Sequence, residues 1–131
     1  YQKIILLYNE DRQPEGILEG FNLFCAQYGI QNKIINTLTD RELFKGELYI
    51  ILDDKNLIRI IKRIKDEYLT LAKDIGIISY NDTLLKEIVE GGITTISTNF
   101  NLMGERLAEM ILNNEFAQVE NPNRLILRKS L

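Results

Sequence analysis

Short polar clusters follow four apolar segments of this 131-residue sequence, and they hold the side chains best suited to chemistry. The clusters combine carboxylates, carboxamides and one guanidinium, at positions 9–12, 53–54, 81–82 and 98–100. Together, such groups suit a polar small molecule held by hydrogen bonds. The same residue types are favoured helix N-caps, so at each position alone the two interpretations carry about equal weight. Their grouping along one edge of a sheet would favour binding.

Another chemistry fits the same carboxylates, that of a phosphoacceptor receiver domain. Glu10 and Asp11 would hold Mg²⁺, Asp53 would attack a phosphoryl group, and Ser79 would supply the hydroxyl of the fourth strand. A receiver also needs a lysine at the end of its fifth strand, and segment 93–98 contains none. The receiver is therefore the less favoured alternative.

Composition excludes several chemistries. Because histidine is absent, there is no imidazole base, no histidine-bound metal and no histidine-centred triad. The single Cys25 cannot form an internal disulfide or a multi-cysteine zinc site. Sixteen basic and 19 acidic residues give a net charge of −3, which disfavours a nucleic-acid surface. No apolar run approaches the roughly 18 residues of a membrane span. We expect a cytoplasmic, non-enzymatic domain with no metal, no cofactor and no membrane contact.

The apolar segments that would position the polar clusters are predicted to be strands. They occupy positions 3–8, 33–38, 47–53, 74–80, 93–98 and 124–128. The connection between the second and third strands, Thr39–Gly46, is short for a parallel crossover. It is interpreted either as containing one capped helical turn over 39–42 or as part of a hairpin.

Four helices are predicted between these strands. Pro14 begins the first and Gly29 ends it, and Cys25 lies on its apolar stripe. The pair 53–54 caps the second, with the stripe Leu57, Ile61, Ile64, Tyr68 and Leu71. The third extends from the cap at 81–83 to position 90. Asn99 or Asn101 caps the last, with the stripe Leu102, Met103, Leu107, Met110 and Ile111. The alternation predicts an α/β fold, a three-layer, doubly wound, mostly parallel sheet.

Two stretches of the sequence resemble a known family. DIGIISYNDT and GGITTISTNFNLMGERLAEMIL look like the signature of LacI/GalR-type effector-binding domains. The earlier ILEGF and the final LILRKS are similar to a helix and the closing strand of the same family, so the resemblance covers nearly the whole chain. GELYIILDD further resembles the sensor domains of GntR-type regulators from Bacteroidetes, which carry an N-terminal winged-helix DNA-binding domain.

This resemblance implies a periplasmic-binding-protein-like lobe. In the family the ligand, commonly a sugar or a nucleobase, lies between two lobes. Residues 1–131 would be a single C-terminal effector-binding and dimerisation fragment, namely the second lobe with the last crossings toward a missing first lobe. The helix over 100–112 would join that first lobe, so here it must be buried on this lobe or on a second chain. We expect a homodimer or an exchanged segment.

The ligand site departs from the family pattern. The family's binding arginine falls on Ile17, which cannot make a bidentate polar contact. Arg12 could replace the lost guanidinium, and Phe100 falls where the family places a ligand-facing aromatic ring. The candidate ligand-binding residues are therefore Arg12, Asp53, Asp54, Asn81, Asp82 and Phe100.

The resemblance implies an effector-sensing domain of a bacterial transcription regulator. A small-molecule effector that prefers one lobe arrangement would shift the placement of two DNA readers in a dimer. DNA would be contacted only through the missing N-terminal domain. A solute-binding lobe serving transport is the other alternative, disfavoured because no export signal is visible in this sequence.

Overall fold

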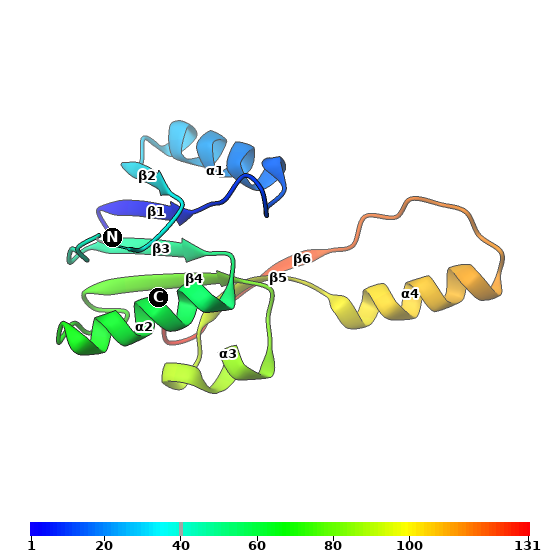
Figure 1. Cartoon of the computed structure of the whole chain (residues 1–131). Helices are drawn as coiled ribbons and strands as arrows, with labels where there is room; N and C mark the ends of the chain where they lie inside the picture. Colours follow the sequence, from blue (N-terminus) through cyan, green and yellow to red (C-terminus); the bar gives the residue numbers. More distant parts are fainter. Residues whose placement is uncertain (40) are drawn as a thin grey trace.

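The strands of the chain form one mixed sheet in the computed structural model, which describes residues 1–39 and 41–131 (Figure 1). The strands are β1 (Lys3–Leu7), β2 (Asn32–Ile35), β3 (Glu47–Ile51), β4 (Ile75–Tyr80), β5 (Thr94–Thr98) and β6 (Asn123–Ile126). Their order is β2-β1-β3-β4-β5-β6, with the first five parallel and β6 antiparallel to β5. The predicted mostly parallel α/β fold is confirmed.

Local signals set the ends of the helices. The helices are α1 (Glu15–Tyr28), α2 (Asp54–Asp66), α3 (Leu84–Ile88) and α4 (Phe100–Leu112), and the 3₁₀ turn Val89–Gly91 follows α3. Pro14 precedes α1, and Gly29 ends it in the left-handed conformation at φ 62°. Asn99, rather than Asn101, caps α4. Within the described residues, no helix is both long and apolar enough to cross a membrane.

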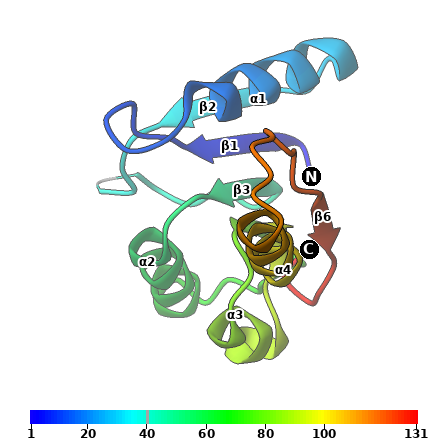
Figure 2. The same ribbon diagram turned by 90° about the vertical axis from the view of Figure 1, so that its right-hand side faces the viewer.

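The sheet carries a hydrophobic core on each face. On one face Ile5, Tyr49 and other strand residues pack with the buried side of α2. On the opposite face Leu6 and its neighbours pack with α1, through residues that include Cys25. Figure 2 shows α1 on one side of the molecule, with α2 and α3 on the other. Burial on both faces explains why the strands read as nearly continuous apolar runs.

The connection between β2 and β3 differs from the prediction. Both strands run parallel to β1, which lies between them, so the hairpin interpretation is wrong. The second strand ends at Ile35, and Leu38 is buried in the core on the α2 side as part of the connection. The helical turn expected over 39–42 includes residue 40, which lies outside the described residues.

The second helix is shorter than its predicted apolar stripe. Tyr68 lies beyond its end, has a positive φ of 55° and is 94% exposed. Leu57 and Ile64 are buried as expected, but Ile60 rather than Ile61 completes the buried face. Tyr68 leaves the stripe because α2 stops at Asp66, after which the chain turns back toward β4.

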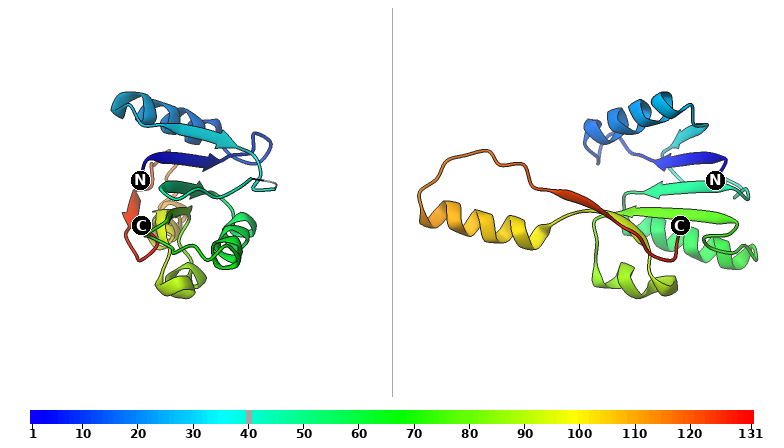
Figure 3. Two further views of the ribbon diagram at one scale, coloured as in Figure 1. Left: turned by 90° about the vertical axis from the view of Figure 1, so that its left-hand side faces the viewer. Right: turned by 180° about the vertical axis from the view of Figure 1, so that it is seen from behind.

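The last helix projects from the body of the domain. Figures 1 and 3 show α4 and the loop after it as an arm that leaves at the end of β5 and returns through β6. None of the residues of α4 is buried, and its stripe residue Ile111 is 68% exposed. The apolar stripe predicted for this helix therefore exists, but it does not pack on this lobe.

Candidate functional site

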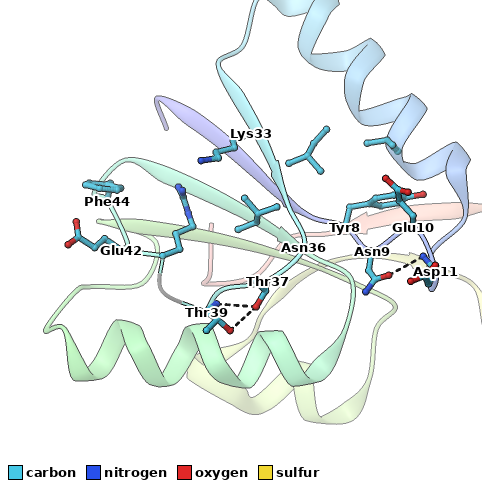
Figure 4. Close-up of a pocket in the computed structure, with 14 residues that line it drawn as sticks. Tyr8, Asn9, Glu10, Asp11, Lys33, Asn36, Thr37, Thr39, Glu42 and Phe44 are labelled. Atoms are coloured by element: carbon cyan, nitrogen blue, oxygen red, sulfur yellow. Dashed lines mark hydrogen bonds between the residues drawn. The ribbon is translucent and has the colours of Figure 1, made fainter.

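A groove of about 1160 Å³ lies beside the carboxyl ends of β1 and β2 (Figure 4). The turn after β1, the strand β2 and the β2–β3 connection supply most of its lining, and Leu18 of α1 completes it. Its polar lining includes Asn9, Glu10, Asp11, Asn36, Thr37 and Thr39. Open sheets of this kind bind ligands at the carboxyl ends of their strands, so this groove is where ligand chemistry is expected.

Internal hydrogen bonds order the polar lining. The Asn9 side-chain oxygen accepts a hydrogen bond of 3.0 Å from the backbone N–H of Asp11, which shapes the turn after β1. Thr37 and Thr39 lie across the groove from this turn, with their hydroxyl oxygens 2.8 Å apart (Figure 4). Figure 4 also shows Lys33 on the β2 side, apart from Glu10 and Asp11. The groove is thus lined by amides, hydroxyls and charges of both signs.

A buried network anchors the connection that forms one wall. Glu47 accepts a hydrogen bond of 2.5 Å from the hydroxyl of Tyr49, and the guanidinium of Arg41 donates to it at 2.6 Å. Burial and the hydrogen bond to Glu47 raise the pKa of Tyr49, so its hydroxyl remains a proton donor. The pair between Arg41 and Glu47 therefore holds the connection against the first residue of β3.

Two candidates, Asp53 and Asp54, are already engaged at the start of α2. Both carboxylate oxygens of Asp53 accept hydrogen bonds from Asn56, one from its backbone N–H at 2.9 Å and one from its side chain at 2.8 Å. The helix-cap interpretation of Asp53 is confirmed. Asp54 pairs with the ammonium group of Lys86 at 2.9 Å, although its side chain remains largely exposed.

The pair Asn81 and Asp82 forms the turn after β4. Asn81 has a left-handed backbone with φ 60°, and its N–H donates to the carbonyl of Ile96 at 2.8 Å. Asp82 accepts hydrogen bonds from the guanidinium of Arg128 and from the hydroxyl of Thr95. The hydrogen bonds from Arg128 hold the pKa of Asp82 below its usual range, so it remains a carboxylate.

The remaining candidates, Arg12 and Phe100, are exposed. Arg12 lies in the turn after β1, and Phe100, which is 47% exposed, is the first residue of α4. None of the six candidates lines the groove. The residues before Arg12 in the same polar cluster, Asn9, Glu10 and Asp11, do line it. A ligand-binding role for the six residues stays a prediction.

Sequence reasoning missed Asn36 and Thr37 as part of the groove. They follow an apolar strand, as do the other polar clusters, and this was the available signal. The prediction placed both residues inside a strand over 33–38, whereas β2 ends at Ile35. In the described residues, no group of three or more potential ligands is arranged to hold a metal ion.

Comparisons with known proteins place this geometry in a family. The family model for the periplasmic binding protein-like domain matches residues 1–131. No curated protein matches the sequence closely.

Solved structures with similar folds include the Lac repressor bound to ONPG in its repressed state. It is 18% identical with a TM-score of 0.73, and the match covers 99% of this chain and 45% of that one. A dimeric Lac repressor with a C-terminal deletion gives 19% identity and a TM-score of 0.74, covering 98% of this chain and 55% of that one. A LacI family transcriptional regulator from Bifidobacterium animalis gives 16% and 0.75, with the same 98% and 55% coverage.

These comparisons define the family and the extent of the match. The chain spans about half the length of the solved structures that it resembles. The finer resemblance to GntR-type sensor domains stays a prediction. The chain belongs to the periplasmic binding protein-like domain family, and its fold is that of the LacI/GalR-type effector domains that its sequence resembles.

Proposed function

We propose that this chain is the effector-sensing and dimerisation part of a bacterial DNA-binding transcription regulator. Residues 1–131 would be one lobe of a two-lobed cytoplasmic sensor, and DNA would be contacted by a separate N-terminal domain, of the GntR type. A small polar molecule would bind between the lobes, at the carboxyl ends of the strands. Its binding would shift the relative placement of two DNA readers in a homodimer.

The arm built from α4 and the following loop is the observation that carries this proposal. It exposes large apolar side chains along its length, including Leu107 at 57%, Ile111 at 68% and Phe116 at 98%. A contiguous apolar surface of this kind normally packs against another lobe or chain. The arm starts where β5 ends, which is the same edge of the sheet as the groove. A lobe packed on the arm would therefore also cover the strand ends and enclose a ligand there.

The similar solved structures also support an effector-binding, dimer-forming role. One is a Lac repressor bound to ONPG and another is a dimeric Lac repressor. They favour effector binding and dimer formation for this chain, whose own ligand would be a sugar or a nucleobase-like molecule.

The polar groups in the structure suggest how contacts are divided within the site. Asn9, Asn36 and Thr37 line the groove and would make the main hydrogen bonds. Asn81 and Phe100 would contact the ligand from the ends of β4 and β5, farther along the same edge of the sheet, with Arg12 and Asp54 at the border. Asp53 and Asp82 would contribute through the turns that they hold, because their oxygens already accept internal hydrogen bonds.

The two alternatives are less favoured. A receiver would need Asp53 as a nucleophile, but here both of its oxygens accept hydrogen bonds from Asn56. A solute-binding lobe of a transport system would share the fold, and an export signal upstream of Tyr1 would favour it over a regulator.

The test uses the full-length protein and its coding sequence. We expect a DNA-binding domain to be encoded upstream of residue 1. D-galactose, D-glucose, adenine and guanine serve as probes in thermal unfolding, and a true effector at a hundredfold excess over its Kd raises Tm by about 5–10 °C. Asn36→Ala, just after β2, should abolish most of this shift, while Asn32→Ala, on β2 but outside the groove, should retain it. An upstream sequence without a DNA-binding domain would overturn the proposal.

A further inference from the structure

Lys86 is a buried cation in an otherwise exposed part of the fold. Its relative exposure is 3%, whereas its neighbours on the short helix α3, Leu84 and Ile88, are exposed by 83% and 74%. Lysine is rarely buried to this degree unless its charge is paired. The identity of its partners therefore indicates what the side chain does.

The ammonium group of Lys86 has three acceptors. It donates to the backbone carbonyl of Tyr80 at 2.8 Å and to that of Asn81 at 2.9 Å. It also pairs with the carboxylate of Asp54 at 2.9 Å. Because an ammonium group has three donors, these contacts match its full hydrogen-bonding capacity. They come from the end of β4, from the turn after it and from the start of α2.

The contact with Asn81 bears on the shape of the turn. Asn81 is one of the non-glycine residues with a positive φ, a conformation that costs free energy unless the surroundings hold it. Its N–H is held by Ile96 on β5 and its carbonyl by Lys86 on α3. Lys86 therefore donates one of the two hydrogen bonds that hold the backbone of Asn81 in this conformation.

We infer that Lys86 is a positioning residue that couples the strand ends of β3 and β4, so that Asp54 and Asn81 move as one unit. Asp54 begins the helix that follows β3, and Asn81 follows β4, so a single side chain links two neighbouring borders of the ligand site. This inference rests on the proposed function only in treating these two residues as ligand contacts. A ligand that displaces either border would then shift both.

Hydrogen–deuterium exchange of the full-length protein tests the coupling without any ligand. The variants are Lys86→Met, which keeps an unbranched chain but removes the charge, Asp54→Asn, and the double variant. Lys55→Met is the matched control, because Lys55 is an exposed lysine adjacent to Asp54. Peptides covering 79–83 and 52–57 report the two borders, and a peptide covering 47–51 reports the sheet interior.

Lys86→Met should raise exchange at both borders by about 10- to 100-fold, the range expected when hydrogen bonds to a charged group are lost. Exchange of the sheet interior in Lys86→Met, and exchange at 79–83 in the Lys55→Met control, should change by less than about twofold, as distant sites do. Asp54→Asn alone should raise exchange at 79–83, and it should add nothing there once Lys86 is replaced. That non-additivity is the signature that a purely stabilising side chain would not produce.

Two results would overturn the inference. One is a uniform increase of exchange over the whole sheet in Lys86→Met, and the other is an effect of Asp54→Asn at 79–83 that persists without Lys86. If Lys86→Met does not fold, Asp54→Asn alone decides, because the inference fails if 79–83 is unchanged. These outcomes are independent of the DNA-binding and effector tests, so failure here leaves the proposed function standing.

Discussion

The guanidinium of Arg128 forms a two-point contact with the carboxylate of Asp82, with distances of 2.7 Å from Nη1 to Oδ1 and 2.9 Å from Nη2 to Oδ2. The two residues are 46 positions apart in the sequence. Arg128 follows β6, the strand that brings the chain back from the arm, and Asp82 lies in the turn after β4. The pair therefore connects the returning segment directly to the edge of the candidate site.

Replacing Asp82 tests how much this pair contributes to stability. The pair lowers the pKa of Asp82 in the folded state. Its stabilising effect is therefore fully present above the unfolded pKa of about 3.9 and is lost as pH falls through the lower folded value. Asp82→Asn should reduce the free energy of unfolding at pH 7 by about 1–3 kcal/mol, and the gap should narrow below pH 4. Urea unfolding at pH 7 and pH 3 measures both values.

The matched control for this experiment is Asp66→Asn. Asp66 is an exposed carboxylate at the end of α2, without an ion pair among the described residues. Its replacement should change the free energy of unfolding by less than about 0.5 kcal/mol at either pH. Equal stability of Asp82→Asn and the parent at pH 7 would contradict a stabilising pair.

The cap at Asp53 predicts a difference between two similar substitutions. Asp53→Ala removes both acceptors for Asn56 and should lower the free energy of unfolding by about 1 kcal/mol. Asp53→Asn keeps an oxygen that can cap α2 and should cost much less. Chemical denaturation of the two variants side by side measures the difference. If both variants lose the same stability, the negative charge rather than the cap is responsible.

The difference in burial between α2 and α4 predicts that apolar substitutions on the two helices differ sharply in their effect on the free energy of unfolding. Ile60→Ala removes a fully buried side chain of α2 and should cost about 2–5 kcal/mol. Leu107→Ser on α4 should cost less than about 0.5 kcal/mol in the monomeric lobe, because the side chain is exposed.

Self-association provides a second measurement on the same arm. If the apolar face of α4 is covered by a second chain, the 131-residue chain should sediment as a dimer whose melting temperature rises with concentration. Leu107→Ser together with Ile111→Ser should shift it toward monomer. A monomer at all concentrations would refute the expected dimer for this chain.

Burial of Cys25 predicts slow thiol chemistry. Its exposure is 2% on the inner side of α1, and burial raises the pKa of its thiol. Reaction with an aromatic disulfide reagent at pH 8 should be at least about a hundredfold slower in the native protein than in urea, because it requires opening of α1. Native and unfolded rates that agree would place the thiol at the surface instead.

Much of the architecture was predictable because its signals are local. Pro14 and Gly29 mark the ends of α1, and the cap at Asp53 starts α2, since each acts through neighbouring backbone groups. The apolar strands also predicted burial on both faces, which led to a mostly parallel sheet. The candidate site was predictable only in part: the turn that begins at Asn9 lines the groove, as expected of polar residues at the end of a strand, whereas none of the six candidate residues does.

Other features depended on the path of the whole chain. The spatial order, with β1 between β2 and β3, placed Asn36 and Thr37 in the groove, and no local signal specifies which strands are neighbours. Likewise, Asp54 and Asp82 form ion pairs only because the fold places Lys86 and Arg128 beside them.

The sequence by itself determined the helices, the strands and the family, because backbone preference, capping and apolar periodicity operate over a few residues. The tertiary structure alone decided which polar groups are free to meet a ligand and which apolar face is left uncovered on α4. The physical reason is that burial and hydrogen-bond partners depend on segments that are distant in the sequence and meet only in the folded chain. The stabilising free energy of these contacts is therefore a property of the whole fold.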